Sequence, residues 1–152
     1  MRLIKAKPSD FDSVYPVIMN SLENLSDNLP NSIDNSMYMM SDMIDHYYYE
    51  FFIIDENGFQ GYVYAYRYRP DDKNIVIYSF SKNKEIRKMS LLEMKRILFD
   101  NVPLHKIFVY VLEDDKSLIE ICNSLMELEG RFIEYVYHDG CYKDVLLYGW
   151  KV

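Results

Sequence analysis

The chain has 152 residues, of which 49% are hydrophobic and 27% charged, and this size and composition predict one globular domain over residues 1–152. Its formal net charge of -7 argues against nucleic acid and membrane as partners, because both favour basic surfaces, and no apolar run has the length of a signal peptide or a membrane span. Without such a run we expect a cytoplasmic protein. Cys122 and Cys141 lie in different predicted elements and lack zinc-type spacing, so we expect neither a metal site nor a disulfide framework.

The first part of the chain predicts a strand followed by two helices. Residues 2–6 form a short apolar strand. In residues 7–25, apolar side chains recur at helical spacing, and Ser9 stands where it can cap the helix. A second helix is predicted over residues 37–50, after a polar loop.

Three strands joined by tight turns come next. Residues 51–69 predict a hairpin, because the Asn57-Gly58 pair supplies the positive φ that a tight turn requires. Residues 75–81 form the following strand. A stripe of tyrosines, typical of half-buried sheet surface rather than of a ligand platform, points to one side of the second strand: Tyr62, Tyr64, Tyr66 and Tyr68.

The remainder alternates between helix and strand. A helix over 90–102, a strand over 106–113 and a helix over 114–129 precede a closing hairpin over 131–152. The order β-α-α-β-β-β-α-β-α-β-β predicts an α/β (α+β) fold, with one mixed, mostly antiparallel sheet of about seven strands and helices on both faces. The two strands that flank the helix over 90–102 should be parallel, with a right-handed connection.

A basic cluster stands just before the helix over 90–102. Ser90 and Glu93 fit a capping box, which places the start of that helix at Ser90. A helix N-terminus with cations beside it suits a phosphate group, whereas the alternative is a solvated loop that relieves an acidic surface. The cations stand near the single carboxylate of Glu85: Lys82, Lys84, Arg87 and Lys88.

Several strings resemble the GNAT superfamily of N-acetyltransferases, nearest the branch of the ribosomal-protein-alanine N-acetyltransferases. The string LEGRFIEYVYHDGCYKDVLLYG, residues 128–149, is similar to that branch's closing signature, E-G through D-G-x-Y-x-D-x-x-x-Y-G. IVIYSFSKNKEIRKM and PLHKIFVYVLEDDKSLIEI extend the resemblance over residues 75–150. The matching positions of the signature are Glu129, Gly130, Asp139, Gly140, Tyr142, Asp144, Tyr148 and Gly149.

The resemblance implies acetyl-CoA as co-substrate, in a cleft where the fourth and fifth strands splay apart. The family's R-G-K-G loop, whose backbone holds the pyrophosphate, falls on residues 86–89, so Arg87 and Met89 replace both glycines. Side-chain cations would then substitute for part of the backbone cradle. Asp115 replaces the family's asparagine after the fifth strand. The implied cofactor-binding residues are Ser79, Phe80, Ser81, Arg87, Lys88, Met89, Ser90 and Asp115.

The candidate catalytic residues follow from the same resemblance. An amine that attacks a thioester needs a base for its proton, an N–H for the oxyanion and an acid for the thiolate. Tyr78 and Cys122 are the nearest candidates for acid or base. Both also have a structural interpretation, since Tyr78 suits a strand core and Cys122 lies on an apolar helix face. His138 could act as a base only if the closing hairpin reaches the cleft.

Two functions stay open at this point. The first is an acyl-CoA-dependent N-acetyltransferase that acts on a primary amine, in a small molecule or at a protein N-terminus. The second is a catalytically degenerate GNAT-like binding or regulatory module. The missing loop glycines favour the second, and the intact closing signature favours the first. The aromatic run at 47–52 could line an acceptor cleft or a homodimer interface, but ordinary core is the preferred interpretation.

Overall fold

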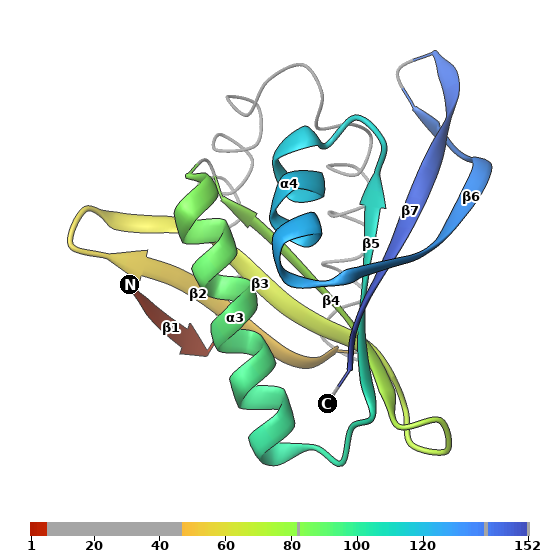
Figure 1. The fold of residues 1–152 in the computed structure, drawn as a ribbon. Helices are drawn as coiled ribbons and strands as arrows, with labels where there is room; N and C mark the ends of the chain where they lie inside the picture. Colours follow the sequence, from red (N-terminus) through yellow and green to blue (C-terminus); the bar gives the residue numbers. More distant parts are fainter. Residues whose placement is uncertain (6–46, 82, 139, 152) are drawn as a thin grey trace.

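The structure is a computed structural model that describes residues 1–5, 47–81, 83–138 and 140–151. These residues form one seven-stranded mixed sheet and two helices (Figure 1). The helices are α3 (Lys84–Asn101) and α4 (Lys116–Leu125). The strands are β1 (Arg2–Lys5), β2 (Tyr47–Asp55), β3 (Gly58–Arg69), β4 (Asn74–Ser81), β5 (Lys106–Leu112), β6 (Glu127–His138) and β7 (Cys141–Lys151).

The strands lie in the order β1-β2-β3-β4-β5-β7-β6. Strands β4 and β5 pair in parallel, and every other neighbouring pair is antiparallel. The parallel pair is the one joined by α3, because a chain that leaves one strand and returns parallel to it must cross over the sheet. The predicted mixed sheet and its single parallel pair are therefore confirmed.

Both predicted hairpins form, and local chemistry explains each turn. Gly58 has φ 98° and Gly140 has φ 81°, conformations that side-chain-bearing residues rarely adopt. In the first turn, the Asp55 carboxylate accepts a hydrogen bond from the Asn57 amide (2.7 Å) and another from Gln60 Nε2 (3.0 Å). These bonds hold the β2–β3 turn from inside, and the turn in turn sets the register of the two strands.

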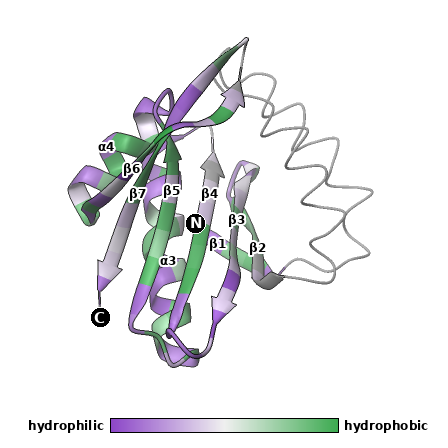
Figure 2. Cartoon of the chain, turned by 90° about the vertical axis from the view of Figure 1, so that its right-hand side faces the viewer, coloured by the Kyte–Doolittle hydropathy of each residue, from purple (hydrophilic) through white to green (hydrophobic). Residues whose placement is uncertain are grey.

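The hydrophobic core lies between the sheet and the two described helices, which cover the same face (Figures 1 and 2). Along β5, buried and half-buried residues alternate, as expected for a strand with one face against the core. α3 contacts β3 and β4, and α4 contacts β6. The helical part of the core is Leu91, Met94 and Leu98 from α3, with Leu118, Ile121 and Cys122 from α4.

Tyrosines pack side by side on the sheet, as the stripe predicted. Tyr62 and Tyr64 are buried, with their ring centroids 5.6 Å apart, and Tyr64 lies 5.8 Å from Tyr78 on the neighbouring strand. Phe52 extends the row across to β2, at 5.6 Å from Tyr62. Cross-strand aromatic contacts of this kind stabilise a sheet, so the stripe has a structural role.

The C-terminal ends of two predicted helices are wrong. The helix predicted over 37–50 does not include its last four residues, because Tyr47–Glu50 belong to β2 and pair with β3. The helix predicted over 114–129 ends at Leu125, and β6 begins at Glu127, paired with Gly149. In both places sheet pairing overrides a helical pattern. The helix predicted over 7–25 and the first ten residues of the helix predicted over 37–50 lie outside the described residues.

Neither of the two described helices has the length and apolarity needed to cross a lipid bilayer.

Candidate functional site

The candidate site lies where β4 and β5 diverge. The two strands pair only at Asn74 with Lys106, Ile75 with Ile107 and Val76 with Phe108. Beyond that point β4 continues to Ser81 and β5 to Leu112 without pairing with each other. Because the strands are parallel, α3 and α4 both begin at this end of the sheet. In open α/β sheets, ligands bind at the carboxyl ends of such strands.

Helix α3 begins earlier than predicted. Its first residue is Lys84 and its N-cap is Asn83, whose side chain accepts hydrogen bonds from the amides of Glu85 (2.9 Å) and Ile86 (3.2 Å). The capping box at Ser90 is therefore wrong: Ser90 lies within the helix, and its hydroxyl donates to the Arg87 carbonyl at 2.8 Å. Asparagine is as good a cap as serine, and residues 84–89 contain no helix breaker.

The early start of α3 changes what its N-terminus can offer to an anion. A helix attracts phosphate through the unpaired amides of its first turn. Two of these amides, of Glu85 and Ile86, are bound by Asn83. Lys84 makes an ion pair with Glu120 of α4. The first turn of α3 is thus bonded to the protein itself at these two amides and at the Lys84 side chain.

Arg87 is buried between β4 and α4, with 4% of its surface exposed. Its guanidinium forms two parallel bonds with Asp115, from Nη1 to Oδ1 (2.9 Å) and from Nη2 to Oδ2 (2.8 Å). Its Nε donates to the Ser79 carbonyl on β4 at 2.7 Å. Its Nη2 also lies 3.4 Å from the Tyr78 hydroxyl. Arg87 therefore bridges the two diverging halves of the sheet, a geometry that the planar guanidinium favours.

Asp115 has two tasks at the start of α4. It is the N-cap of the helix, and its Oδ1 accepts a bond from the Leu118 amide at 3.1 Å as well as from Arg87. Its side chain is 13% exposed. An asparagine at this position could cap the helix but could not neutralise a guanidinium. The carboxylate and Arg87 thus depend on each other for charge balance.

The three serines expected at the site are buried and bonded. Since Ser90 gives its proton to the Arg87 carbonyl, the 2.6 Å contact between Ser79 and Ser90 has Ser79 as donor. Ser81 donates to the Gln60 carbonyl at 2.7 Å. These hydroxyls fasten α3 and β3 to β4, and none is left to donate to a ligand.

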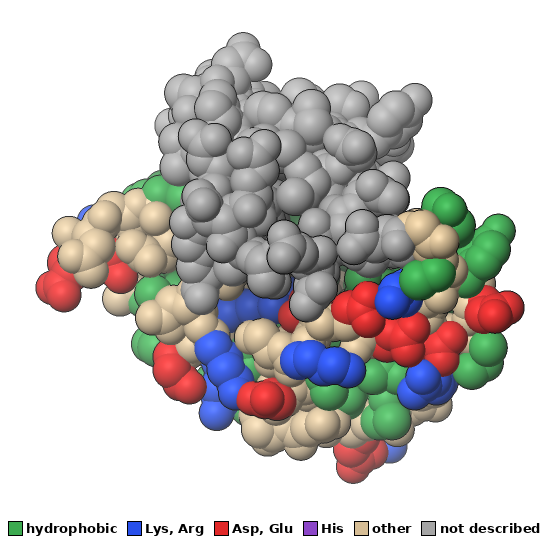
Figure 3. All heavy atoms as spheres, turned by 90° about the horizontal axis from the view of Figure 1, so that it is seen from above, with side chains coloured by type: hydrophobic (Ala, Val, Ile, Leu, Met, Phe, Trp, Pro, Cys, Tyr) green, Lys and Arg blue, Asp and Glu red, His purple; other side chains and the backbone are tan. Residues whose placement is uncertain are grey.

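The other expected cofactor-binding residues take no part in the Arg87–Asp115 contacts. Lys88 is half-buried and has no ion-pair partner among the described residues, and Met89 is exposed. Phe80 pairs with Tyr62 through the backbone. Looking onto this end of the sheet, cationic and acidic side chains are interspersed over the described surface instead of forming one basic patch (Figure 3).

Both candidate catalytic groups are held in their protonated forms. Burial raises the pKa of Tyr78 to about 12, Arg87 opposes the rise and Asp115 adds to it. Burial likewise raises the pKa of Cys122 to about 12, against the effect of Arg87. At pH 7 only about 1 in 10⁵ of such groups is ionised, so neither is a ready base. Arg87 stays charged, because although burial lowers its pKa, Tyr78 and Asp115 raise it above its usual value.

The two cysteines should differ sharply in reactivity. Cys141 is exposed and Cys122 is buried in the core. Because the thiolate is the reactive form, burial and a raised pKa both protect Cys122. We expect DTNB to modify Cys141 rapidly in the folded protein and Cys122 only as the chain unfolds. Absorbance of the released thiolate measures both phases. The control is Cys141→Ser, which should lose the fast phase; fast modification of that variant would contradict the burial of Cys122.

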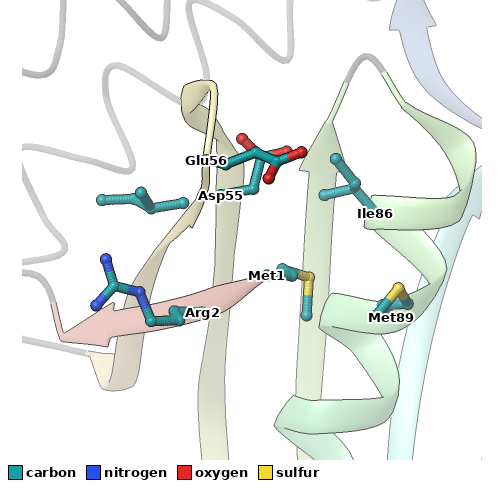
Figure 4. A pocket seen from close by; sticks show the side chains of 7 residues that line it. Met1, Arg2, Asp55, Glu56, Ile86 and Met89 are labelled. Carbon is teal, nitrogen blue, oxygen red and sulfur yellow. The ribbon is translucent and has the colours of Figure 1, made fainter.

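A pocket of about 590 Å³ is lined on one side by α3 (Figure 4), and Arg87 is not among its lining residues. It opens between the start of β1, the β2–β3 turn and α3. Its lining includes one cation and two carboxylates, which makes it a poor receptor for a pyrophosphate. The lining residues are Met1, Arg2, Ile54, Asp55, Glu56, Ile86 and Met89.

Within the described part of the chain, no three His, Cys, Asp or Glu side chains gather as a metal site.

Sequence reasoning missed two features of this site. Asn83 could have been recognised, since asparagine before a run of helix-forming residues is a capping signal. The contact between Arg87 and Asp115 was visible only as two separate departures from the family pattern, 28 residues apart. The structure joins these two departures into one ion pair.

The sheet order, with its diverging parallel pair, defines the class: the chain has the fold of the GNAT N-acetyltransferases, as the resemblance implied. No family model and no curated protein matched the sequence. Among solved structures, the chain is similar to RimL, a ribosomal L7/L12 alpha-N-protein acetyltransferase in complex with coenzyme A. The TM-score is 0.77 at 14% identity, over 99% of this chain and 93% of that one.

Two further solved structures are similar over nearly their full length. One is an acetyl transferase from Salmonella typhimurium that modifies the N-terminal serine of ribosomal protein L7/L12, with a TM-score of 0.76 at 13% identity, covering 99% of this chain and 94% of that one. The other is a mutant form of the spermidine N-acetyltransferase SpeG from Vibrio cholerae, with a TM-score of 0.76 at 15% identity, covering 99% and 95%. At these identities the likeness establishes the fold.

Proposed function

We propose that the protein is an acyl-CoA-dependent N-acetyltransferase that moves an acetyl group from acetyl-CoA to a primary amine. The divergence of β4 and β5 after Val76 and Phe108 is the observation that carries this proposal, because it leaves a strand edge beside two helix N-termini. The similar structures support it: one is in complex with coenzyme A, and their named substrates are a protein N-terminus and a polyamine. The acceptor would be an amine of one of these two kinds.

The backbone of β4 would supply the oxyanion donor. In an extended strand, the N–H and C=O of one residue point to the same edge. The Ser79 carbonyl points to Arg87, so the Ser79 amide faces the same edge, towards β5. When the amine attacks the thioester carbon, this N–H would bind the oxygen that becomes negative, and the C–S bond would then break to release the CoA thiolate.

Proton handling would fall to the substrate and water. Tyr78 and Cys122, each with a pKa of about 12, are protonated at neutral pH and cannot accept the amine proton. The acceptor would have to arrive as the neutral amine, and water would carry away the proton released after attack. This arrangement implies slow turnover at neutral pH, because positioned acid–base groups contribute about 10²–10⁴-fold to such reactions.

A catalytically silent binding or regulatory module is the second candidate. The observation that favours it is the internal bonding of the site, since Asn83 holds the first amides of α3 and Asp115 holds Arg87. A module of this kind would keep the fold and lack turnover.

The test is calorimetric titration with acetyl-CoA and with CoA, followed by thiol-release assays with spermidine and with a peptide that has a free N-terminus. Binding with turnover of either amine supports the transferase. Binding without turnover of any amine supports the module. No binding of either ligand at millimolar concentration overturns the transferase proposal.

A further inference from the structure

We infer that Arg87 and Asp115 form an internal latch across the diverging ends of β4 and β5, so that an acyl-CoA can bind only after the Arg87 side chain leaves Ser79. This inference rests on the proposed function for the place of the co-substrate. It adds a self-closing contact that regulates the same site. We call this pair, together with the bond from Arg87 to Ser79, the Arg87–Asp115 latch.

The unpaired edge of β4 is the place where an acyl-CoA arm would bind. A chain of amides, such as the pantetheine arm of CoA, binds a free strand edge through its N–H and C=O groups. Past Val76, the edge of β4 is not paired with β5, and the Ser79 carbonyl points to this edge. That carbonyl already accepts from Arg87 Nε at 2.7 Å. The arginine therefore takes the bond that an incoming arm would need.

The charges of Arg87 and Asp115 hold the latch closed. The Arg87 guanidinium is almost fully buried and is neutralised by a bidentate contact with Asp115. Separating a buried pair is unfavourable unless each charge finds a new partner. Asp115 would keep the Leu118 amide, so the long arginine side chain is the part that can move. Opening the latch would separate these two charges, and CoA binding would have to supply that free energy.

Both residues of the latch replace a different residue in the family pattern. Arg87 stands at the first glycine of the family's R-G-K-G loop, and Asp115 stands at its asparagine after the fifth strand. Glycine at 87 would leave the edge of β4 open, and asparagine at 115 would keep the helix cap without demanding a cation. Both changes are thus needed for the latch, and each accounts for the other. A latch of this kind predicts weak CoA binding in the unaltered chain.

The test compares CoA affinity by calorimetry in the unaltered chain and in three variants. Arg87→Gly with Asp115→Asn removes the latch and keeps the cap of α4. Asp115→Asn alone removes only the carboxylate. Arg96→Gly is the matched control, since Arg96 lies on the same helix, is exposed, and pairs only with Glu93 and Asp100 among the described residues. Circular dichroism confirms folding in each case.

We expect the double variant to bind CoA at least tenfold more tightly than the unaltered chain, and Arg96→Gly to leave the affinity unchanged. If the unaltered chain binds CoA and the folded double variant binds equally or less tightly, the latch is overturned while the CoA site stands. If neither binds at millimolar CoA, the proposed function fails and the latch fails with it.

A second measurement follows the unaltered chain and uses a variant only to assign one signal. In the unaltered chain the Arg87 Nε–H should give a slowly exchanging NMR signal, because it is buried and hydrogen-bonded to Ser79. The absence of this signal in Arg87→Lys assigns it. Saturation with CoA should abolish its protection. Protection that persists in the CoA-saturated protein would overturn the latch.

Discussion

Arg87→Met should lower the free energy of unfolding by about 3–5 kcal/mol, the cost of removing one partner of a buried ion pair. Methionine fills much of the same space, so the loss comes mainly from polar groups left without partners. The Asp115 carboxylate, 13% exposed, would lose both guanidinium bonds, and the Ser79 carbonyl would lose its bond to Nε. Urea denaturation followed by circular dichroism measures the change.

A double-mutant cycle separates the ion pair from other effects. Asp115→Asn keeps a side-chain cap for α4 and removes the charge, so Arg87→Met combined with it should cost clearly less than the two single changes added together. Arg96→Met is the control on the exposed side of α3, where removing an ion pair should cost no more than about 1 kcal/mol. Strictly additive losses would mean that the contact contributes little to stability.

Leu98→Ala should lower the free energy of unfolding by about 2–5 kcal/mol. Leu98 is 0% exposed, in the core between α3 and the sheet, and truncating it removes buried apolar surface and leaves a cavity. Urea denaturation curves give the change in stability, and an unchanged m-value would show that the fold is kept.

Leu92→Ala is the matched control on the same helix. Leu92 is 41% exposed, and alanine favours helix slightly more than leucine, so the expected loss is within about 1 kcal/mol. Comparable losses at residues 92 and 98 would contradict the assigned core face of α3.

The Arg87–Asp115 latch gives one physical reason for two features of the chain. It explains why arginine replaces the first glycine of the phosphate loop, since glycine at 87 could not make the bridge to Asp115. It also places a permanent positive charge beside Tyr78, with the guanidinium carbon 5.7 Å from the ring centroid. The Arg87 cation lowers the pKa of both Tyr78 and Cys122. Burial raises both pKa values by more, so both groups stay protonated.

The amino-acid sequence by itself determined the order of the described elements from β2 onwards, both hairpins and the parallel β4–β5 pair. These features depend on local properties: side-chain periodicity, glycines such as Gly58 and Gly140 at positive φ, and the need for a crossover between parallel strands. The closing signature and the strand before α3 also pointed to the acetyltransferase fold without any coordinates.

Only the tertiary structure decided the state of the candidate site. The sequence predicted Ser90 as the cap of α3, whereas the cap is Asn83; α3 therefore includes Arg87, whose side chain reaches β4 and Asp115. A contact between residues 28 apart depends on how helix and sheet pack. The pKa of Tyr78 and of Cys122 depends on burial, which no local pattern specifies, because desolvation is a property of the folded surroundings and not of the residue.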